Sequence, residues 1–276
     1  MSTKKKRIKR FTVTQRLFHT LLMLSFMLLG ATGLSRLYVN TGWGKWLAGL
    51  FGGYESALVV HKYAGFFMIC GFIIHALYLL TKINWNNFPK SIVGPDSLIP
   101  RGKDITDFFS HIGWFIGFRE LPRFDRWGYW EKFDYWAVFW GMLVIGVTGM
   151  MMAFPLVATQ YMPGWGLNVA LWVHRIEAFL AMGHIFIIHF FIAHLRRHNF
   201  PMDRTMFEGS ADLEAVKSEK PSWIDRLKSN GELEGVLVSD AGLQQKAAFF
   251  VFGHAMVAVG LFLLIGALVN WHSISW

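Results

Sequence analysis

The chain has 276 residues, of which 54% are hydrophobic and 17% aromatic, and its formal net charge at pH 7 is +9. Apolar runs of about 20 residues recur, and each is long enough to cross roughly 30 Å of hydrocarbon, which excludes an ordinary soluble domain. The single cysteine, Cys70, excludes a disulfide framework, a covalently attached haem and a cysteine-bound iron–sulfur cluster.

The apolar runs predict an all-α integral membrane protein, a bundle of five transmembrane helices. We expect the spans at residues 15–38, 57–81, 133–154, 167–195 and 247–269. The first four form a core over 15–208, which includes a long connection at 82–132. A basic segment at 1–14 precedes the core, a second connection occupies 209–246, and residues 247–276 hold the fifth helix and the C-terminus.

The placement of lysine and arginine predicts the orientation of the spans. Seven cations lie between Lys4 and Arg16, and the connections 82–132 and 196–246 carry eight each, whereas 155–166 carries no charge. By the positive-inside rule, the N-terminus and both long connections are cytoplasmic and the C-terminus is periplasmic, in a bacterial inner membrane. Because topology explains the basic charge, we expect no nucleic-acid partner.

The connection at 82–132 contains a segment, 104–118, in which polar and aromatic residues alternate. This pattern suits a helix that lies in the membrane interface. A plain amphipathic helix without a partner is the alternative.

Histidines recur at one spacing in two spans. His61 and His75 lie 14 residues apart in the second span, and His174 and His189 lie 15 apart in the fourth. At 1.5 Å and 100° per residue, each pair covers roughly 21–22 Å and returns to within about 40–60° of one helix face. Two such helices have the arrangement needed to hold one haem near each side of a bilayer.

The expected depths of these histidines assign them to two haem sites. His61 and His174 lie near the outer ends of their helices and are predicted to hold an outer haem, while His75 and His189 share a depth for an inner haem. Neutral imidazole binds haem iron without adding charge to the apolar interior. Any haem here is b-type, because side-chain ligation is the only means of holding it.

The inner site has competing candidates. His19 begins the first span at the cytoplasmic depth and competes with His75 as the partner of His189. A third haem, held by His19 and His194, is a further alternative. Gly65 and Gly71, in the second span, leave room either for a flat macrocycle or for ordinary helix packing.

A quinone site is expected at the cytoplasmic mouth of the third span, where ionisable and aromatic residues crowd together. Proton transfer to a reduced quinone requires such groups near the inner haem. An interfacial anchor is the alternative reading. The candidate residues are Arg16, Glu131, Lys132, Asp134 and Tyr135.

Several motifs resemble the b-type cytochrome subunits of membrane-bound formate dehydrogenases and nickel–iron hydrogenases, together with related thiosulfate-reductase subunits. The matching residues are RLFH at 16–19 with Thr32 and Gly33, HKYAG at 61–65, WEKFDYWAVFWG at 130–141, and VHRIEA (173–178) through IHFFIAH (188–194) to NFPMD (199–203). The resemblance covers residues 8–208. The fifth span, with His254, carries no assignable motif.

The resemblance implies a dihaem, quinone-reactive anchor for a periplasmic redox enzyme. In the best-described formate dehydrogenase members, histidines that match His19 and His189 bind the inner haem, and those that match His61 and His174 bind the outer one. This chain departs from them by having His75. Geometry therefore favours His75 as the second inner ligand, whereas the resemblance favours His19.

The function expected from these features is electron transfer between a periplasmic partner and menaquinone or ubiquinone. The partner is expected to be an iron–sulfur protein or a multihaem cytochrome c, and the sequence leaves the direction of electron flow open. One alternative is a haem-free helical anchor whose histidines line a proton or metal path. Another is a stand-alone transmembrane reductase, which is disfavoured because the outer loops are too short to form a substrate domain.

Overall fold

The computed structural model describes residues 6–195, 199–200, 202–240 and 242–274. The first five residues of the basic N-terminal segment and the last two of the chain lie outside the described residues. The chain divides into two compact units. Unit 1 comprises Met1–Arg16, Leu77–Ala137 and Arg204–Phe249, and unit 2 comprises Leu17–Ala76, Val138–Asp203 and Phe250–Trp276.

Five long apolar helices confirm the five predicted spans. They are α1 (Val13–Leu37), α3 (Tyr54–Lys82), α5 (Tyr129–Ala153), α7 (Gly166–Gly183) and α11 (Leu243–Val269). The fourth span continues beyond α7 through two π-helical segments, η2 (His184–His189) and η3 (Phe191–Leu195). These π segments were not predicted, because their extra residue per turn leaves no mark on hydropathy.

The long helices expose much of their apolar surface. Leu17 is 65% exposed, Tyr63 71% and Phe67 59%. In water such surface would be unfavourable by roughly 25 cal/mol per Å². In a membrane the lipid chains cover it, so these faces are the expected lipid-facing surface of the bundle.

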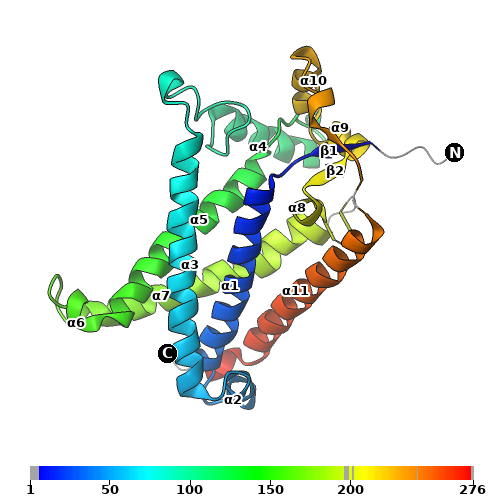
Figure 1. Cartoon of the computed structure of the whole chain (residues 1–276). Coiled ribbons are helices and arrows are strands. Elements are labelled where there is room, and N and C mark those ends of the chain that lie inside the picture. Colours follow the sequence, from blue (N-terminus) through cyan, green and yellow to red (C-terminus); the bar gives the residue numbers. More distant parts are fainter. Residues whose placement is uncertain (1–5, 196–198, 201, 241, 275–276) are drawn as a thin grey trace. The chain divides into compact units, whose positions relative to one another are not determined.

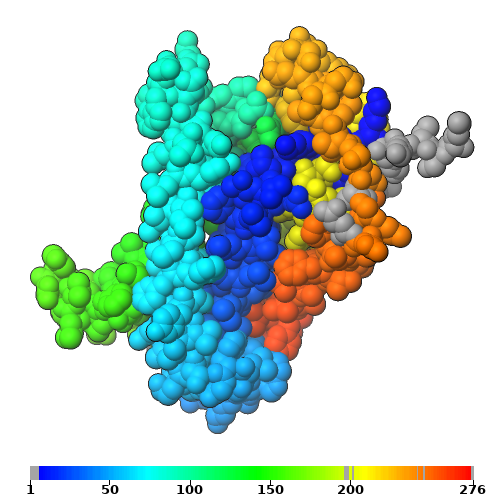
Figure 2. All heavy atoms as spheres, in the orientation of Figure 1, coloured from blue at the N-terminus to red at the C-terminus, as the bar shows by residue number. Residues whose placement is uncertain are grey.

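The core of unit 2 joins α1, α7 with its π segments, and α11 (Figure 1; Figure 2 shows the blue α1 between the cyan α3 and the orange-red α11). Leu34, Phe186 and Leu263 are each at most 2% exposed in this core. The hydroxyl of Tyr38 donates a 2.8 Å hydrogen bond to the Ala267 carbonyl. Short helices α2 (Gly42–Gly49) and α6 (Pro155–Ala158) lie in the connections, and the 3₁₀ turn η5 (Trp271–Ser273) follows α11.

Unit 1 contains a small antiparallel sheet in the order β2-β1-β3. The strands are β1 (Arg7–Lys9), β2 (Ser210–Asp212) and β3 (Leu237–Val238). Ile8 of β1 is fully buried against Leu213, Trp223 and Leu227. The described part of the basic N-terminal segment is therefore a structured strand that packs on the second long connection.

Short helices complete unit 1. They are α4 (Gly102–Phe115), α8 (Thr205–Glu208), α9 (Leu213–Glu219) and α10 (Pro221–Ser229), with the 3₁₀ turns η1 (Trp85–Asn87) and η4 (Glu234–Val236). Helix α4 confirms the helix predicted near 104–118. Phe109 and Phe115 on it are 61% and 71% exposed. Its position in the membrane interface stays a prediction.

Charged residues link the two long connections within unit 1. Arg226 on α10 donates to both carboxylate oxygens of Asp96, at 2.9 and 2.8 Å, and to Asp125 at 2.9 Å. Burial alone raises the pKa of Asp96, but the hydrogen bonds and charge of Arg226 outweigh it, so the pKa lies below its usual range. The ionised carboxylate is thus the stable form in the folded unit.

Candidate functional site

His61 on α3 and His174 on α7 face each other inside unit 2. Their ring centroids lie 6.3 Å apart, with the ring planes inclined by 72°. Two imidazoles on opposite sides of one metal ion, each bonded at roughly 2 Å, have centroids about 6 Å apart. The structure therefore brings together the predicted outer pair at a separation that fits bis-histidine ligation of haem iron.

Hydrogen bonds fix which nitrogen of each ring is available. Thr32 on α1 donates its hydroxyl to the Leu28 carbonyl at 2.8 Å, and its oxygen lies 2.9 Å from Nδ1 of His61. Because that hydroxyl proton is already engaged, the threonine oxygen accepts, and Nδ1 of His61 carries the proton. The neutral ring then presents Nε2 as its free lone pair, which is the form that binds a metal.

The second ring of the pair is held in the same way. Thr148 on α5 donates to the Val144 carbonyl at 2.7 Å, and its oxygen lies 3.1 Å from Nδ1 of His174. The Ile145 carbonyl also lies 3.1 Å from this nitrogen. A carbonyl only accepts, so Nδ1 of His174 is protonated and Nε2 is free.

A glycine follows each threonine and lies against the same ring. A Cβ atom added at Gly33 would lie 3.4 Å from Cε1 of His61, and one at Gly149 would lie 3.3 Å from Cε1 of His174. The contact at Gly149 would require a shift of a few tenths of an ångström, and the contact at Gly33 is at the short end of ordinary van der Waals distances. Glycine at both positions thus lets each ring lie close to the backbone of the facing helix.

These features belong to an internal repeat that relates α1 and α3 to α5 and α7. The motif Gly-x-Thr-Gly occurs at 30–33 and again at 146–149. Gly30 faces Met182, eight residues after His174, and Gly146 faces Ile69, eight residues after His61. The two helix pairs therefore pack on each other reciprocally, and His61 and His174 are equivalent positions in the repeat.

At the expected inner depth, His19 and His75 remain the two candidate partners of His189. His19 lies within electrostatic range of both His189 and His194. His75 makes an edge contact with Phe18, with ring centroids 4.9 Å apart. The rings of His189 and His194 are 6.5 Å apart on the π-helical part of the fourth span.

The π-helical segment η2 interrupts the regular helix between the outer and inner depths of the fourth span. His75 follows His61 by 14 residues, whereas His189 follows His174 by 15. A π turn absorbs one additional residue and rotates all later side chains around the helix axis. His189 therefore points in a direction that a regular helix would not give it, and π segments of this kind occur frequently at functional sites.

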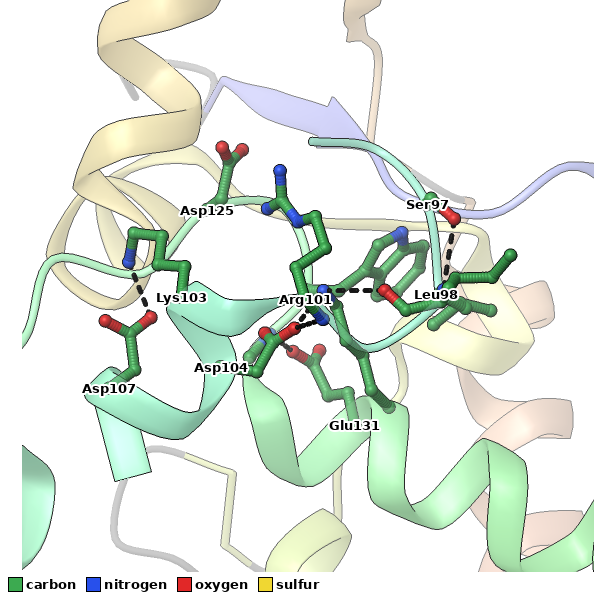
Figure 3. Close-up of polar contacts among 12 residues, drawn as sticks. Ser97, Leu98, Arg101, Lys103, Asp104, Asp107, Asp125 and Glu131 are labelled. Carbon is green, nitrogen blue, oxygen red and sulfur yellow. Dashed lines mark hydrogen bonds and ion pairs between the residues drawn. The ribbon is translucent and has the colours of Figure 1, made fainter. Parts of the chain in front are cut away.

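Glu131 and Lys132, predicted to serve a quinone site, form ion pairs within unit 1. The pair of Lys132 is buried, and those of Glu131 are partly buried. Glu131 pairs with Lys220 and, at 3.1 Å, with Arg10, and it accepts the Gly128 amide at 2.6 Å. The ammonium of Lys132 lies 2.8 Å from Asp104, whose carboxylate also accepts the backbone amide of Arg101 (Figure 3). These contacts give both residues a structural role, because breaking one partner leaves a buried charge unpaired.

The remaining quinone candidates lie near the N-terminal ends of α1 and α5. Arg16 donates to the Phe207 carbonyl, and its guanidinium lies 5.7 Å from the ring centroid of Phe249. Asp134 and Tyr135 are half-buried and lie further into α5 than Glu131. The part of these residues in a quinone site stays a prediction.

Sequence reasoning missed Thr148 and Gly149 and gave Thr32 no role. The repeated Gly-x-Thr-Gly motif was the signal that could have found them. The sequence alone also left open the role of Gly71. A Cβ atom added there would lie 2.7 Å from Leu21 of α1. Gly71 therefore serves the packing of α3 on α1, and the macrocycle reading is not needed there.

Comparison with known protein families assigns most of the chain. A model described as prokaryotic cytochrome b561 matches residues 10–209, which include His19, His61, His174 and His189. No curated protein matches the chain. Members of this family bind b-type haem, and the histidine pair and five spans described above fit that cofactor. The chain therefore belongs to the prokaryotic cytochrome b561 family and is a multi-pass membrane cytochrome.

Proposed function

We propose that this chain is the membrane subunit of a larger oxidoreductase complex and transfers electrons between a periplasmic redox partner and the quinone pool. It would hold two b-type haems, one between His61 and His174 and one between His19 and His189. The single observation that carries the proposal is the geometry of the His61–His174 pair, with both Nδ1 atoms hydrogen-bonded and both Nε2 atoms free.

The residues of the chain would act as ligands, spacers and proton carriers. Haem b, when bound, supplies a reversible one-electron carrier. The 14 to 15 residues between the two histidine levels separate the sites by roughly 21–22 Å along the helices, so together they cross most of the hydrocarbon layer. Apolar helix faces around the sites exclude water, and Asp134 would pass protons to reduced menaquinone or ubiquinone.

The identity of the partner follows from the motif resemblance. Subunits with these motifs serve formate dehydrogenases, nickel–iron hydrogenases and thiosulfate reductases, so an iron–sulfur protein is the favoured periplasmic partner and a multihaem cytochrome c the second. A haem-free anchor is the competing function, and it predicts purified protein without a Soret band. Strong b-type absorption that is reducible by quinol would exclude that alternative.

The quinone proposal is tested at Asp134. We expect Asp134→Asn to keep both haems while slowing quinone-linked haem oxidation or reduction at least tenfold, about 1.4 kcal/mol of barrier. Stopped-flow haem spectra with a soluble quinone analogue measure this rate. Glu131→Gln is the matched comparison. Because it breaks partly buried ion pairs with Lys220 and Arg10, we expect it to lower thermal stability. Normal turnover in Asp134→Asn would remove this residue from the quinone site.

The orientation is tested by labelling single cysteines in a Cys70→Ser background. Ser229 and Ser273 are both exposed, and they lie on opposite sides of the membrane if the positive-inside prediction holds. We expect an impermeant maleimide to label Ser273→Cys in spheroplasts and Ser229→Cys only after the membrane is broken. Labelling of both residues in intact spheroplasts contradicts the proposed topology.

A further inference from the structure

We propose that Thr32 and Thr148 are matched positioning residues that lower the midpoint potential of the haem held by His61 and His174. The inference rests on the outer haem site of the proposed function. It goes beyond that function by assigning the reduction potential of the site to two side chains that do not touch the iron.

Both threonines are placed for this role by contacts on two sides. Thr32 is fully buried and Thr148 is 8% exposed, so bulk water has little access to either hydroxyl. Each hydroxyl donates to a carbonyl four residues earlier in its own helix, at 2.8 and 2.7 Å. Each oxygen then faces the Nδ1 atom of one histidine, at 2.9 and 3.1 Å.

This chain of hydrogen bonds makes each threonine oxygen a stronger acceptor. A hydroxyl that donates becomes more negative at oxygen, and hydrogen bonds in a low-dielectric interior strengthen one another. The Nδ1–H group bonded to it gives the imidazole partial negative character, which raises the basicity of Nε2. At His174 the Ile145 carbonyl lies equally close to Nδ1, so Thr148 shares this proton and its effect should be the smaller of the two. A more basic ligand favours ferric over ferrous iron, so the midpoint potential falls.

The duplication of the device argues that it serves the iron rather than helix packing alone. Gly-x-Thr-Gly occurs in two helices that lie more than 100 residues apart in the sequence. Each copy contacts a different ring of the same histidine pair. If only packing were at stake, the repeat would need small residues but no hydroxyl at the third position. Because both rings would bind one iron, their two effects on its potential should add.

The test is a potentiometric titration of the purified, haem-loaded full chain with Thr32→Val, Thr148→Val and the double variant. The outer haem is identified as the signal that His174→Ala removes. We expect its midpoint potential to rise in each valine variant. The ferric-to-ferrous ratio at fixed potential should fall by up to about tenfold, which corresponds to about 59 mV for one electron. The two shifts should add in the double variant. The inner haem should keep its potential.

Three further variants serve as controls. Serine keeps the hydroxyl, so Thr32→Ser and Thr148→Ser should stay near the wild-type potential. Thr159→Val removes a hydroxyl that bonds its i−4 carbonyl, Pro155, in the same way but is exposed, and it should shift nothing. If a valine variant loses the outer haem while its serine counterpart keeps it, the hydroxyl still proves to be the group that positions the ligand.

Three results overturn the inference. They are an unchanged outer midpoint in both valine variants, equal shifts in the serine and valine variants, or loss of the outer haem with serine as well as valine. The proposed function fails separately, if His174→Ala removes no haem from otherwise wild-type protein. The two failures are therefore distinguishable in one set of preparations.

Discussion

Substituting alanine for His174 should remove one of the two b-type haems that we propose for this chain and leave the other reducible. The ring of His174 is one of two facing imidazoles 6.3 Å apart, and the loss of either ligand leaves the iron with a single axial bond. Haem content is measured by the pyridine haemochrome assay against protein concentration, and the remaining haem by dithionite difference spectra. The haem that stays in place also reports that the bundle has folded.

Two comparisons sharpen this prediction. His61→Ala should give the same loss, because both rings serve one site, and the double variant should lose nothing more. His272→Ala changes an exposed histidine after α11 and should keep the full haem content. Intact haem content in both His61→Ala and His174→Ala would contradict the outer pairing.

The five spans and the outer histidine pair were predictable because both follow from regular helix geometry. Hydropathy over about 20 residues identifies a span whatever its neighbours are. The depths of His61 and His174 follow from counting residues along two helices of known direction. The sequence predicted from depth alone that the two rings face each other. In the structure their centroids lie 6.3 Å apart, a distance suited to one metal ion.

The inner histidine pair could not be settled in this way. Residue counting gave His75 and His189 the same depth, but depth says nothing about direction around the helix axis. The extra residue of the π segment η2 changes that direction for His189. Such a segment depends on local packing and has no hydropathy signature, so regular 100° geometry cannot give the direction of His189 around the helix axis.

The ion pairs of the charged residues near the third span could not be predicted for a related reason. Glu131 and Lys132 looked like proton carriers because they lie at the mouth of an apolar helix. Their partners, Lys220 and Asp104, are 89 and 28 positions away in sequence. The small sheet was also missed, since strands of two or three residues are too short to show alternation.

The inner haem provides the last test, because His19 and His75 make opposite predictions. We expect His189→Ala and His19→Ala each to lose the inner haem and keep the outer one, since His19 lies within electrostatic range of His189. His75→Ala is the matched control at the same depth and should keep both haems. Haem-resolved redox titration at low temperature distinguishes the two signals in each variant.

The opposite pattern of losses would be equally informative. If His75→Ala loses the inner haem and His19→Ala does not, the π segment does not select the ligand as argued, and the regular repeat extends to the inner site. If His19→Ala and His75→Ala each remove a different signal, the chain holds a third haem, for which His194 is the remaining candidate ligand at that depth. Because the outer haem depends on neither residue, its unchanged spectrum shows that each variant has folded and that the loss is local.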